Sequence, residues 1–284
     1  MSQPEPQISV RKSQRNREPF SAEKLRISLR RAGASRQAIN EVMEQIRPQL
    51  RDGISTTAIQ RMAGRLLKRR SRKAAVTYSL KRALLQLGPS GFPFEQFCGR
   101  LFEAMGYKVE YNQTLAGRCV THEVDIVARR NGKTLFAECK FHNRAGYRND
   151  VKMPLYIKAR SMDLQHTEQG AHDQFWLLSN TMFSEDALTY ADCVGLILAG
   201  HNTDHYPLTR DLINQHGLHP ITCLSRLKQA HKRALIDADV LLCREVIEQP
   251  GVLTPLNISD RETDIVLREC RDIIQSAQAK DEEP

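Results

Sequence analysis

The segment HEVDIVARRNGKTLFAECK, residues 122 to 140, constrains the fold of this chain more than any other stretch. It reads as two apolar strands joined by a turn, yet Asp125, Glu138 and Lys140 interrupt the apolar runs. An ion taken into a strand core costs several kcal/mol unless it is paired. Exposure at a strand end explains one such charge easily, but three together indicate a functional site.

The alternation of side chains along a strand predicts how these charges meet. Glu138 and Lys140 are two residues apart and share one face, while Cys139 points the other way. Asp125 on the neighbouring strand can reach them across the ladder. Two convergent carboxylates repel, and a divalent cation that prefers oxygen ligands relieves the repulsion. The arrangement therefore predicts a Mg²⁺ site.

Length and composition set the class of protein. A chain of 284 residues favours about two domains. It has no apolar stretch of about 18 residues, and its first residues, MSQPEPQ, form no apolar signal segment, so we expect a cytoplasmic protein without a membrane partner. The seven cysteines include no CxxC pair, which argues against a disulfide framework and a structural zinc site.

The net charge of +9 is unevenly placed. Residues 1 to 90 contain 20 Lys and Arg against 6 Asp and Glu, whereas the rest contains 22 against 27. A basic segment concentrates anionic partners such as nucleotides or nucleic acid. A solvated basic face is equally compatible with charge alone.

The first third of the chain is predicted to be mostly helical. Residues 7 to 20 fit a small hairpin, and Ser21 can cap a helix that runs to about Ala32. Apolar residues at helical spacing mark a second helix, Ile39, Val42, Met43, Ile46 and Leu50. Thr56 or Thr57 can cap a third helix to about Lys68, and a fourth begins after RRSRK and ends at Leu87. The run GPSGFP then gives the best boundary.

Beyond this boundary the elements alternate. A helix at 94 to 102 precedes strands near 107 to 111, 123 to 129 and 134 to 140. Next come a helix at 151 to 164, the strand FWLLS, a helix near 187 to 191 and the strand VGLILAG. Such an order predicts a mixed sheet covered by helices. From about 221 the pattern is helical, with QPGVLTP as a break. We therefore expect a small helical domain at 1–88, an α/β core at 89–205 and a helical extension at 206–284.

The charged strands also resemble a known signature. Asp125, twelve intervening residues and then Glu138 and Lys140 resemble the D-x(n)-E-x-K pattern of the PD-(D/E)XK nuclease superfamily, close to its Mrr-like restriction endonuclease branch. GFPFEQFCGRLFEAMGY resembles the leading helix of that branch, and FWLLSNTMFSEDALTYADCVGLILAG resembles its closing strand, helix and strand. The resemblance covers about residues 91 to 200.

This resemblance implies roles for individual residues. Asp125 and Glu138, joined by Glu95 of the leading helix, would hold Mg²⁺ against a scissile phosphate of DNA. The backbone carbonyl of Cys139 would be a further ligand, while its thiol belongs to the core. Lys140 would orient or activate the attacking water.

Other polar residues near the two strands have competing interpretations. His122 and His142 flank the strands and invite a zinc site, but they lack a CxxC or HxxxH companion, which favours surface or supporting roles. Tyr156, Lys158 and Arg160 follow on the next helix. They fit phosphate contacts and a solvated amphipathic face equally well.

The basic N-terminal segment carries a second resemblance. Residues 10 to 25, VRKSQRNREPFSAEKL, resemble the opening of an ATP cone, the nucleotide-binding module of ribonucleotide reductases and their transcriptional regulator. The match implies that ATP or dATP binds as a regulatory ligand to Lys12, Glu18, Lys24 and Thr56. The alternative is a basic helical domain that grips DNA through RLLKRRSRK, residues 65 to 73.

Together these features predict a Mg²⁺-dependent endonuclease that acts on DNA and senses ATP or dATP. Regulation by a nucleotide needs two states of the protein, for which two arrangements of a homo-oligomer are the expected form. A nucleotide-responsive DNA-binding regulator with a vestigial nuclease core is the alternative, and RNA is an alternative substrate. Charges retained at 125, 138 and 140 favour an intact site.

Overall fold

The computed structural model describes residues 8–13, 16–144, 146–201, 203 and 209–278. The chain divides into two compact units, one made of residues 1–79 with 275–284 and the other of residues 80–274. Within the described residues, no helix is long and apolar enough to cross a lipid bilayer. The domain boundaries expected from the sequence, at 88 and 205, stay predictions.

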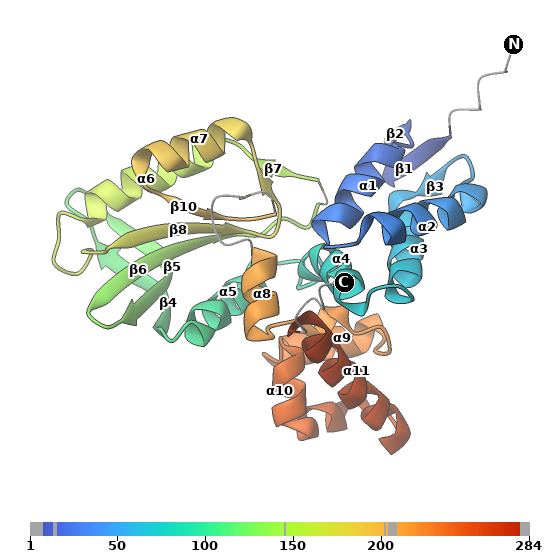
Figure 1. The fold of residues 1–284 in the computed structure, drawn as a ribbon. Coiled ribbons are helices and arrows are strands. Elements are labelled where there is room, and N and C mark those ends of the chain that lie inside the picture. The colour runs from blue at the N-terminus through green and yellow to red at the C-terminus, as the bar shows by residue number, and fades with distance from the viewer. Residues whose placement is uncertain (1–7, 14–15, 145, 202, 204–208, 279–284) are drawn as a thin grey trace, which may run out of the picture. The chain divides into compact units, whose positions relative to one another are not determined.

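The N-terminal unit combines a small sheet with helices (Figure 1). Its strands are β1 (Ser9–Ser13), β2 (Asn16–Pro19) and β3 (Ile54–Ser55), and its helices are α1 (Ala22–Arg31), α2 (Arg36–Ile46), α3 (Thr56–Lys68) and the first turns of α4 (Arg72–Leu84). The strand order is β2-β1-β3, with β1 antiparallel to β2 and parallel to β3. The predicted hairpin and the mostly helical character are confirmed.

Serine side chains begin all four of these helices. In each case the hydroxyl accepts a hydrogen bond from the backbone N–H three residues later, at 3.1 to 3.2 Å, and the four are Ser21, Ser35, Ser55 and Ser71. Such caps satisfy backbone donors that the first helical turn leaves without partners. The predicted cap at Ser21 is confirmed. The cap predicted at Thr56 or Thr57 is wrong, because Ser55 takes that place and Thr56 is the first helical residue. Helix α4 likewise begins earlier than expected, inside the basic run.

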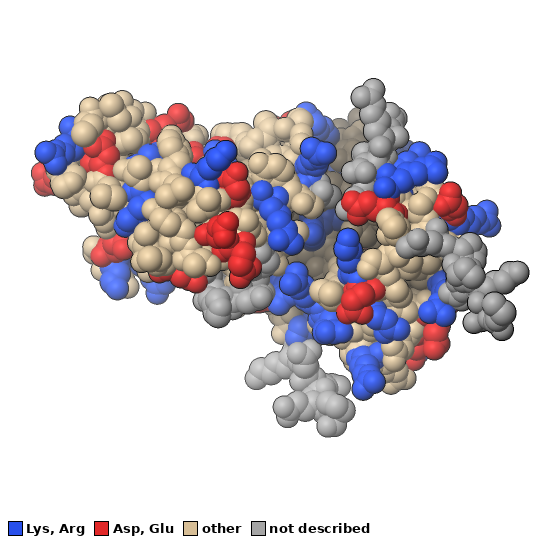
Figure 2. All heavy atoms as spheres, turned by 90° about the horizontal axis from the view of Figure 1, so that it is seen from above, with Lys and Arg blue, Asp and Glu red and all other residues tan. Residues whose placement is uncertain are grey.

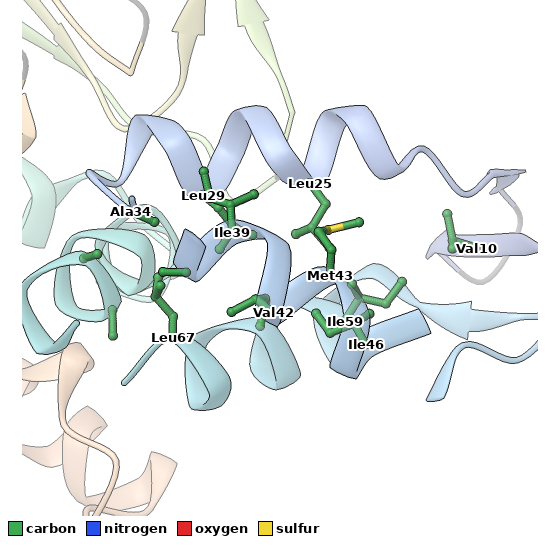
Figure 3. Packing of buried hydrophobic residues seen from close by; sticks show 14 residues of the cluster. Val10, Leu25, Leu29, Ala34, Ile39, Val42, Met43, Ile46, Ile59 and Leu67 are labelled. Atoms are coloured by element: carbon green, nitrogen blue, oxygen red, sulfur yellow. The ribbon is translucent and has the colours of Figure 1, made fainter. Parts of the chain in front are cut away.

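One apolar cluster holds the N-terminal unit together (Figure 3). The predicted face of α2 lies inside it, and Ile46 is fully buried. Leu29 of α1 and Leu67 of α3 pack into the same cluster and are fully buried as well. Leu50, expected on the same helix, lies beyond the end of α2 and is only partly buried, because a 3-10 turn at Arg47–Gln49 intervenes.

The second unit contains the predicted mixed sheet. Its elements in chain order are α5 (Phe92–Ala104), β4 (Lys108–Ala116), β5 (Thr121–Arg130), β6 (Lys133–Lys140), β7 (Arg148–Asn149), α6 (Lys152–Leu164), β8 (Gln174–Ser179), β9 (Met182–Phe183), α7 (Glu185–Val194) and β10 (Ile197–Ala199). The order β10-β8-β6-β5-β4 joins an antiparallel meander, β4 to β6, to the parallel strands β6, β8 and β10. The short pair β7 and β9 was not predicted.

Helices cover both faces of this sheet, with α6 and α7 on one side and α5 on the other (Figure 1). Phe136 packs with Ile157 of α6 in one core cluster. On the α5 side, Phe102 meets Trp176 edge to face, with ring centroids 5.5 Å apart. Gly99 allows α5 to approach closely, because a Cβ there would collide with the phenol of Tyr111. Helix α5 therefore packs closely against the sheet.

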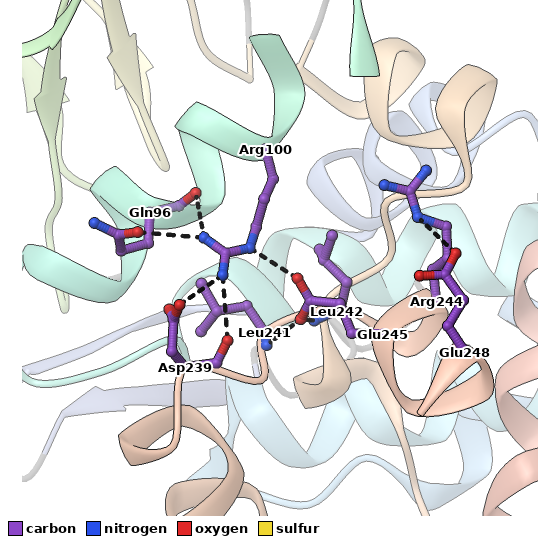
Figure 4. Close-up of polar contacts among 8 residues, drawn as sticks. All are labelled: Gln96, Arg100, Asp239, Leu241, Leu242, Arg244, Glu245 and Glu248. Carbon is purple, nitrogen blue, oxygen red and sulfur yellow. Dashed lines mark hydrogen bonds and ion pairs between the residues drawn. The ribbon is translucent and has the colours of Figure 1, made fainter. Parts of the chain in front are cut away.

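The C-terminal region is helical, as expected, but more broken. It contains α8 (Thr209–His216), α9 (Gln229–Asp237), α10 (Cys243–Glu248) and α11 (Asp260–Gln278). Asp239, with a φ of 58°, lies in the turn that separates α9 from α10 in a stretch predicted as continuous helix. The predicted break QPGVLTP contains most of a 3-10 helix, Pro250–Leu256. Arg100 of α5 binds this region through Asp239 and Glu245 (Figure 4).

Candidate active site

The four charged residues singled out in the nuclease-like region converge on one part of the sheet. Glu95 lies in the first turn of α5, Asp125 in β5, and Glu138 and Lys140 at the end of β6. The backbone N–H of Cys139 donates to Oδ2 of Asp125 at 2.7 Å, which places this carboxylate against the β6 residues. Nζ of Lys140 lies 3.5 Å from Oε1 of Glu138.

An interruption in the ladders explains how Asp125 reaches Cys139. The pairing of β5 with β6 runs from Arg130 to Ile126 and stops before Asp125. On the other side, the β4 ladder skips Asn112, whose φ of 52° is left-handed. Asparagine tolerates this conformation better than most residues. Asp125 therefore lies where regular pairing lapses on both sides, and its carboxylate accepts the Cys139 N–H.

The electrostatics of the cluster favour a cation. Burial, reinforced by the charges of Glu138 and Glu95, raises the pKa of Asp125 to about 7. Burial also raises the pKa of Glu95, and Glu138 and Glu123 add to the effect. A nearby positive charge favours the ionised form of both carboxylates. Lys140 supplies such a charge to both Asp125 and Glu95.

Arg160 is a second cation at the site, bound to Glu138, and the sequence did not indicate its place among the carboxylates. Its NH1 donates to Oε2 of Glu138 at 2.6 Å, and its NH2 donates to the carbonyl of Glu123. Its guanidinium carbon lies 5.4 Å from the ring centroid of Tyr156. Arg160 is therefore buried at the site and does not belong to a solvated face. The sequence signal that could have indicated its burial is its position three residues after the apolar Ile157, on the same face of α6.

The remaining candidates around the strands have structural partners. Lys158 donates to the carbonyl of Val194 at 3.1 Å, at the end of α7. Nε2 of His122 lies 2.8 Å from Oδ2 of Asp163, and this contact is the main cause that lowers the pKa of Asp163 to about 2. Nε2 of His142 contacts Oδ1 of Asn149 at 2.7 Å. These contacts agree with supporting roles for both histidines.

The donor set suits a metal that prefers oxygen, although its side chains are engaged with other partners. No group of three or more His, Cys, Asp or Glu side chains in the described part of the chain is arranged to hold an ion. Glu138 is already held by Arg160 and Lys140, and Oδ2 of Asp125 by a backbone N–H. Two carboxylates and a backbone carbonyl are nevertheless ligands of the type that Mg²⁺ takes.

The predicted nucleotide residues lie near one another in the N-terminal unit. Nζ of Lys24 is 3.9 Å from Oε2 of Glu18, in an exposed pair. Thr56 begins α3 directly after β3, and β3 pairs with β1, the strand that contains Lys12. The side chain of Lys12 is outside the described part of the structure. The small sheet thus brings together β1 and β2, which contain Lys12 and Glu18, and β3, which ends directly before Thr56.

The basic run 65–73 surrounds the turn between α3 and α4. Its exposed cations are Arg65, Lys68, Arg69, Arg70 and Arg72. Arg70 is paired with Glu41 at 2.5 Å. Figure 2 shows lysine and arginine side chains at many places on the displayed face, with acidic side chains between them.

Three family models match the chain in succession. An ATP cone domain matches residues 8–84, a restriction endonuclease domain matches residues 88–201, and an AF1548-like C-terminal domain matches residues 219–274. The first two confirm the resemblances found in the sequence, in the same order.

The chain is also similar to proteins whose own function is not described. An uncharacterized protein of Archaeoglobus fulgidus is 34% identical over 176 residues, which are 62% of this chain and 98% of the relative. The crystal structure of AF1548, a protein of unknown function, is similar with a TM-score of 0.52 and 31% identity, covering 67% of this chain and 98% of the other.

Proposed function

The chain belongs to the same family as the Archaeoglobus fulgidus protein. Because it also contains a restriction endonuclease domain preceded by an ATP cone domain, we propose that it is a Mg²⁺-dependent endonuclease. Its substrate would be the phosphodiester backbone of DNA. The ATP cone would bind ATP or dATP as a regulatory ligand that is not consumed, since the sequence contains no GxxxxGK[ST] loop.

The convergence of Asp125, Glu138 and Lys140, with Glu95 beside them, carries this proposal. A buried carboxylate whose pKa is raised to about 7, mainly by burial and further by its acidic neighbours, is unfavourable in a protein without a compensating function. A divalent cation offsets the repulsion and restores the ionised form. Donor chemistry and electrostatics therefore support the same ion.

Asp125, Glu138 and the carbonyl of Cys139 would hold the ion, with Glu95 as a further ligand. The ion supplies a lowered pKa for a bound water and a positive charge opposite the scissile phosphate. Lys140 is 35% exposed in its side chain, so it contacts Glu138 and still reaches solvent. From this position it would orient the attacking water and attract the phosphate.

The ion pair between Arg160 and Glu138 favours a second candidate function. In a DNA-binding regulator with a vestigial core, a permanent ion pair would replace the metal at this carboxylate. The two candidates differ in whether Glu138 is ever released to an ion. They share DNA binding and nucleotide binding, so only catalysis separates them.

Incubation with plasmid, linear and single-stranded DNA, in Mg²⁺ or in EDTA, tests the proposal. We expect cleavage in Mg²⁺ only, and its loss in D125A, E138A and K140A with DNA binding retained. K133A is the matched control, since Lys133 is an exposed lysine at the opposite end of β6. Cleavage in EDTA would contradict the metal dependence. Binding without cleavage under every condition would favour the regulator.

A further inference from the structure

A cavity of about 300 Å³ opens beside Lys140. Its walls come from the end of β6, the loop after it, β7 and the first turns of α6. The residues that line it include Lys140, His142, Tyr147, Asp150, Lys152 and Tyr156. All belong to the second unit.

An aromatic pair forms one wall of this cavity. The rings of His142 and Tyr147 are stacked, with centroids 3.9 Å apart and planes 27° from parallel. Tyr147 is nevertheless 44% exposed. A tyrosine backed on one face and open to solvent elsewhere has the form of a stacking platform.

A buried hydrogen-bond network fixes the orientation of this wall. The amide nitrogen of Asn149 donates to Thr181, Ser179 and the carbonyl of Met182, at 3.0 to 3.2 Å. The amide oxygen of Asn149 therefore faces His142, and Nε2 of His142 must be the donor in their 2.7 Å contact. Asn149 is 2% exposed, so the histidine is held by the interior of the fold.

The cavity also borders the proposed catalytic site, through Lys140. Lys140 lies 3.5 Å from Glu138 on one side and lines the cavity on the other. Tyr156 lines it as well, with its ring beside the guanidinium of Arg160, which binds Glu138. Whatever occupies the cavity therefore sits next to the position proposed for the scissile phosphate.

We propose that this cavity binds an unpaired nucleobase of a single DNA strand, adjacent to the phosphate that is cut. The inference rests on the proposed function and narrows its substrate to single-stranded or locally unpaired DNA. A base can stack on Tyr147 only when its own face is free, which excludes a base stacked within a regular duplex.

The charges of the lining agree with such an occupant. Lys140 and Lys152 are cations that suit the flanking phosphates of a DNA strand. The carboxylate of Asp150 can accept a hydrogen bond from the exocyclic amino group of cytosine or adenine. An apolar ligand would gain nothing from these three groups.

Binding measured in EDTA tests the cavity without relying on catalysis. The probe is a short fluorescein-labelled single strand of DNA, together with a series in which one base at a time is replaced by an abasic site. We expect one position at which the abasic site weakens binding to the full-length wild type by about 5-fold to 100-fold. The penalty should vanish in Y147L and persist in Y147F, which keeps the ring.

L155A is the matched control, because Leu155 is a 45% exposed apolar residue of α6 that does not line the cavity. It should bind every probe as wild type does.

A flat abasic series, equal effects of Y147L on single strand and duplex, or stronger ring-dependent binding to RNA of the same sequence would each overturn the inference. Ring-dependent binding without cleavage in Mg²⁺ would support base binding in the cavity and contradict the nuclease activity. Cleavage with a flat abasic series would support the nuclease activity and contradict base binding in the cavity.

Discussion

Arg160 donates a 2.6 Å hydrogen bond to Glu138, and the two side chains are only 7% and 9% exposed. The pair joins α6 to the end of β6. Breaking a buried pair by removing one partner is costly, because the other charge is left without compensation. Glu138 is also a proposed metal ligand, so Arg160 and the ion would share one carboxylate.

Replacing Arg160 by methionine should therefore destabilise the metal-free protein by about 3–5 kcal/mol. Mg²⁺ should restore part of this loss, because an ion that binds only the folded state stabilises it by mass action. Urea denaturation of R160M in EDTA and in Mg²⁺ measures both effects. The Mg²⁺ increment should be larger in R160M than in wild type.

Lys140 provides the control for this prediction, since it contacts the same carboxylate at 3.5 Å with a side chain that is 35% exposed. K140M should cost less than R160M, because the Lys140 ammonium contacts Glu138 at a longer distance and reaches solvent. The double variant R160M/E138L removes both charges and should be more stable than R160M alone. Equal stability of R160M and wild type would show that the pair is not formed.

The raised pKa of Asp125 predicts a pH dependence of stability. The carboxyl has a pKa of about 7 in the folded protein, against an ordinary value of 3.8. Between about pH 4 and 7 the folded state keeps a proton that the unfolded state has lost, so the free energy of unfolding falls as pH rises. The slope from this group is at most about 1.4 kcal/mol per pH unit and ends above pH 7.

Comparison of wild type with D125N isolates this contribution, because the amide cannot titrate. In EDTA, the difference in the free energy of unfolding between the two proteins should change steadily from pH 4 to 7 and then level off. Mg²⁺ should stabilise wild type more at pH 8 than at pH 6, since the ligand must be ionised. A difference independent of pH would contradict the raised pKa.

Local patterns predicted most of the fold because they act over a few residues. The alternation around Glu138 and the apolar spacing of α2 each report which side of an element is buried. The ends of elements were less certain: Ser55 and Thr56 are both good caps, and only the structure shows which one is used. The two-residue strands β7 and β9 have too little pattern to be recognised.

The residues of the candidate site were predicted where sequence neighbours carry them, and Glu95 was added by the family resemblance. Glu138 and Lys140 are linked by strand parity, and Asp125 by the hairpin. The contact between Arg160 and Glu138 joins residues 22 apart across a crossover, which periodicity alone does not specify. The same holds for His142 and Asn149, because their contact depends on the short strand β7.

The ion pairs of Arg100 link α5 to the C-terminal helices. It binds Glu245 and Asp239 at 2.8 Å each, and Glu245 also accepts from the backbone N–H groups of Leu241 and Leu242 (Figure 4). R100M should cost about 1–3 kcal/mol by urea denaturation and speed amide exchange near residue 241. Arg233 is the control: its 3.6 Å pair with Asp237 is exposed, so R233M should cost under about 1 kcal/mol.

The exposed cations of the run 65–73 predict the salt dependence of DNA binding. If they bind phosphates, neutralising them should flatten the slope of log affinity against log salt by about 0.9 for each duplex phosphate that is no longer neutralised. The variant replaces Arg65, Lys68, Arg69 and Arg72 by glutamine. The control replaces four other exposed cations of the N-terminal unit, Arg36, Arg47, Arg51 and Arg61. Equal slopes in the two variants would make the run a solvated surface.

The N-terminal unit should bind ATP or dATP without hydrolysing it. Lys24 is exposed and only loosely paired with Glu18, so its ammonium can turn to a triphosphate. Calorimetry on the full chain should show binding that weakens at least about 10-fold in K12A/K24A, because the charge-assisted hydrogen bonds to the phosphates are removed. The matched control R36A/R47A removes two cations outside the predicted site and should bind as wild type does. Release of phosphate would contradict binding without hydrolysis. Equal affinity in the two double variants would place the nucleotide at another site.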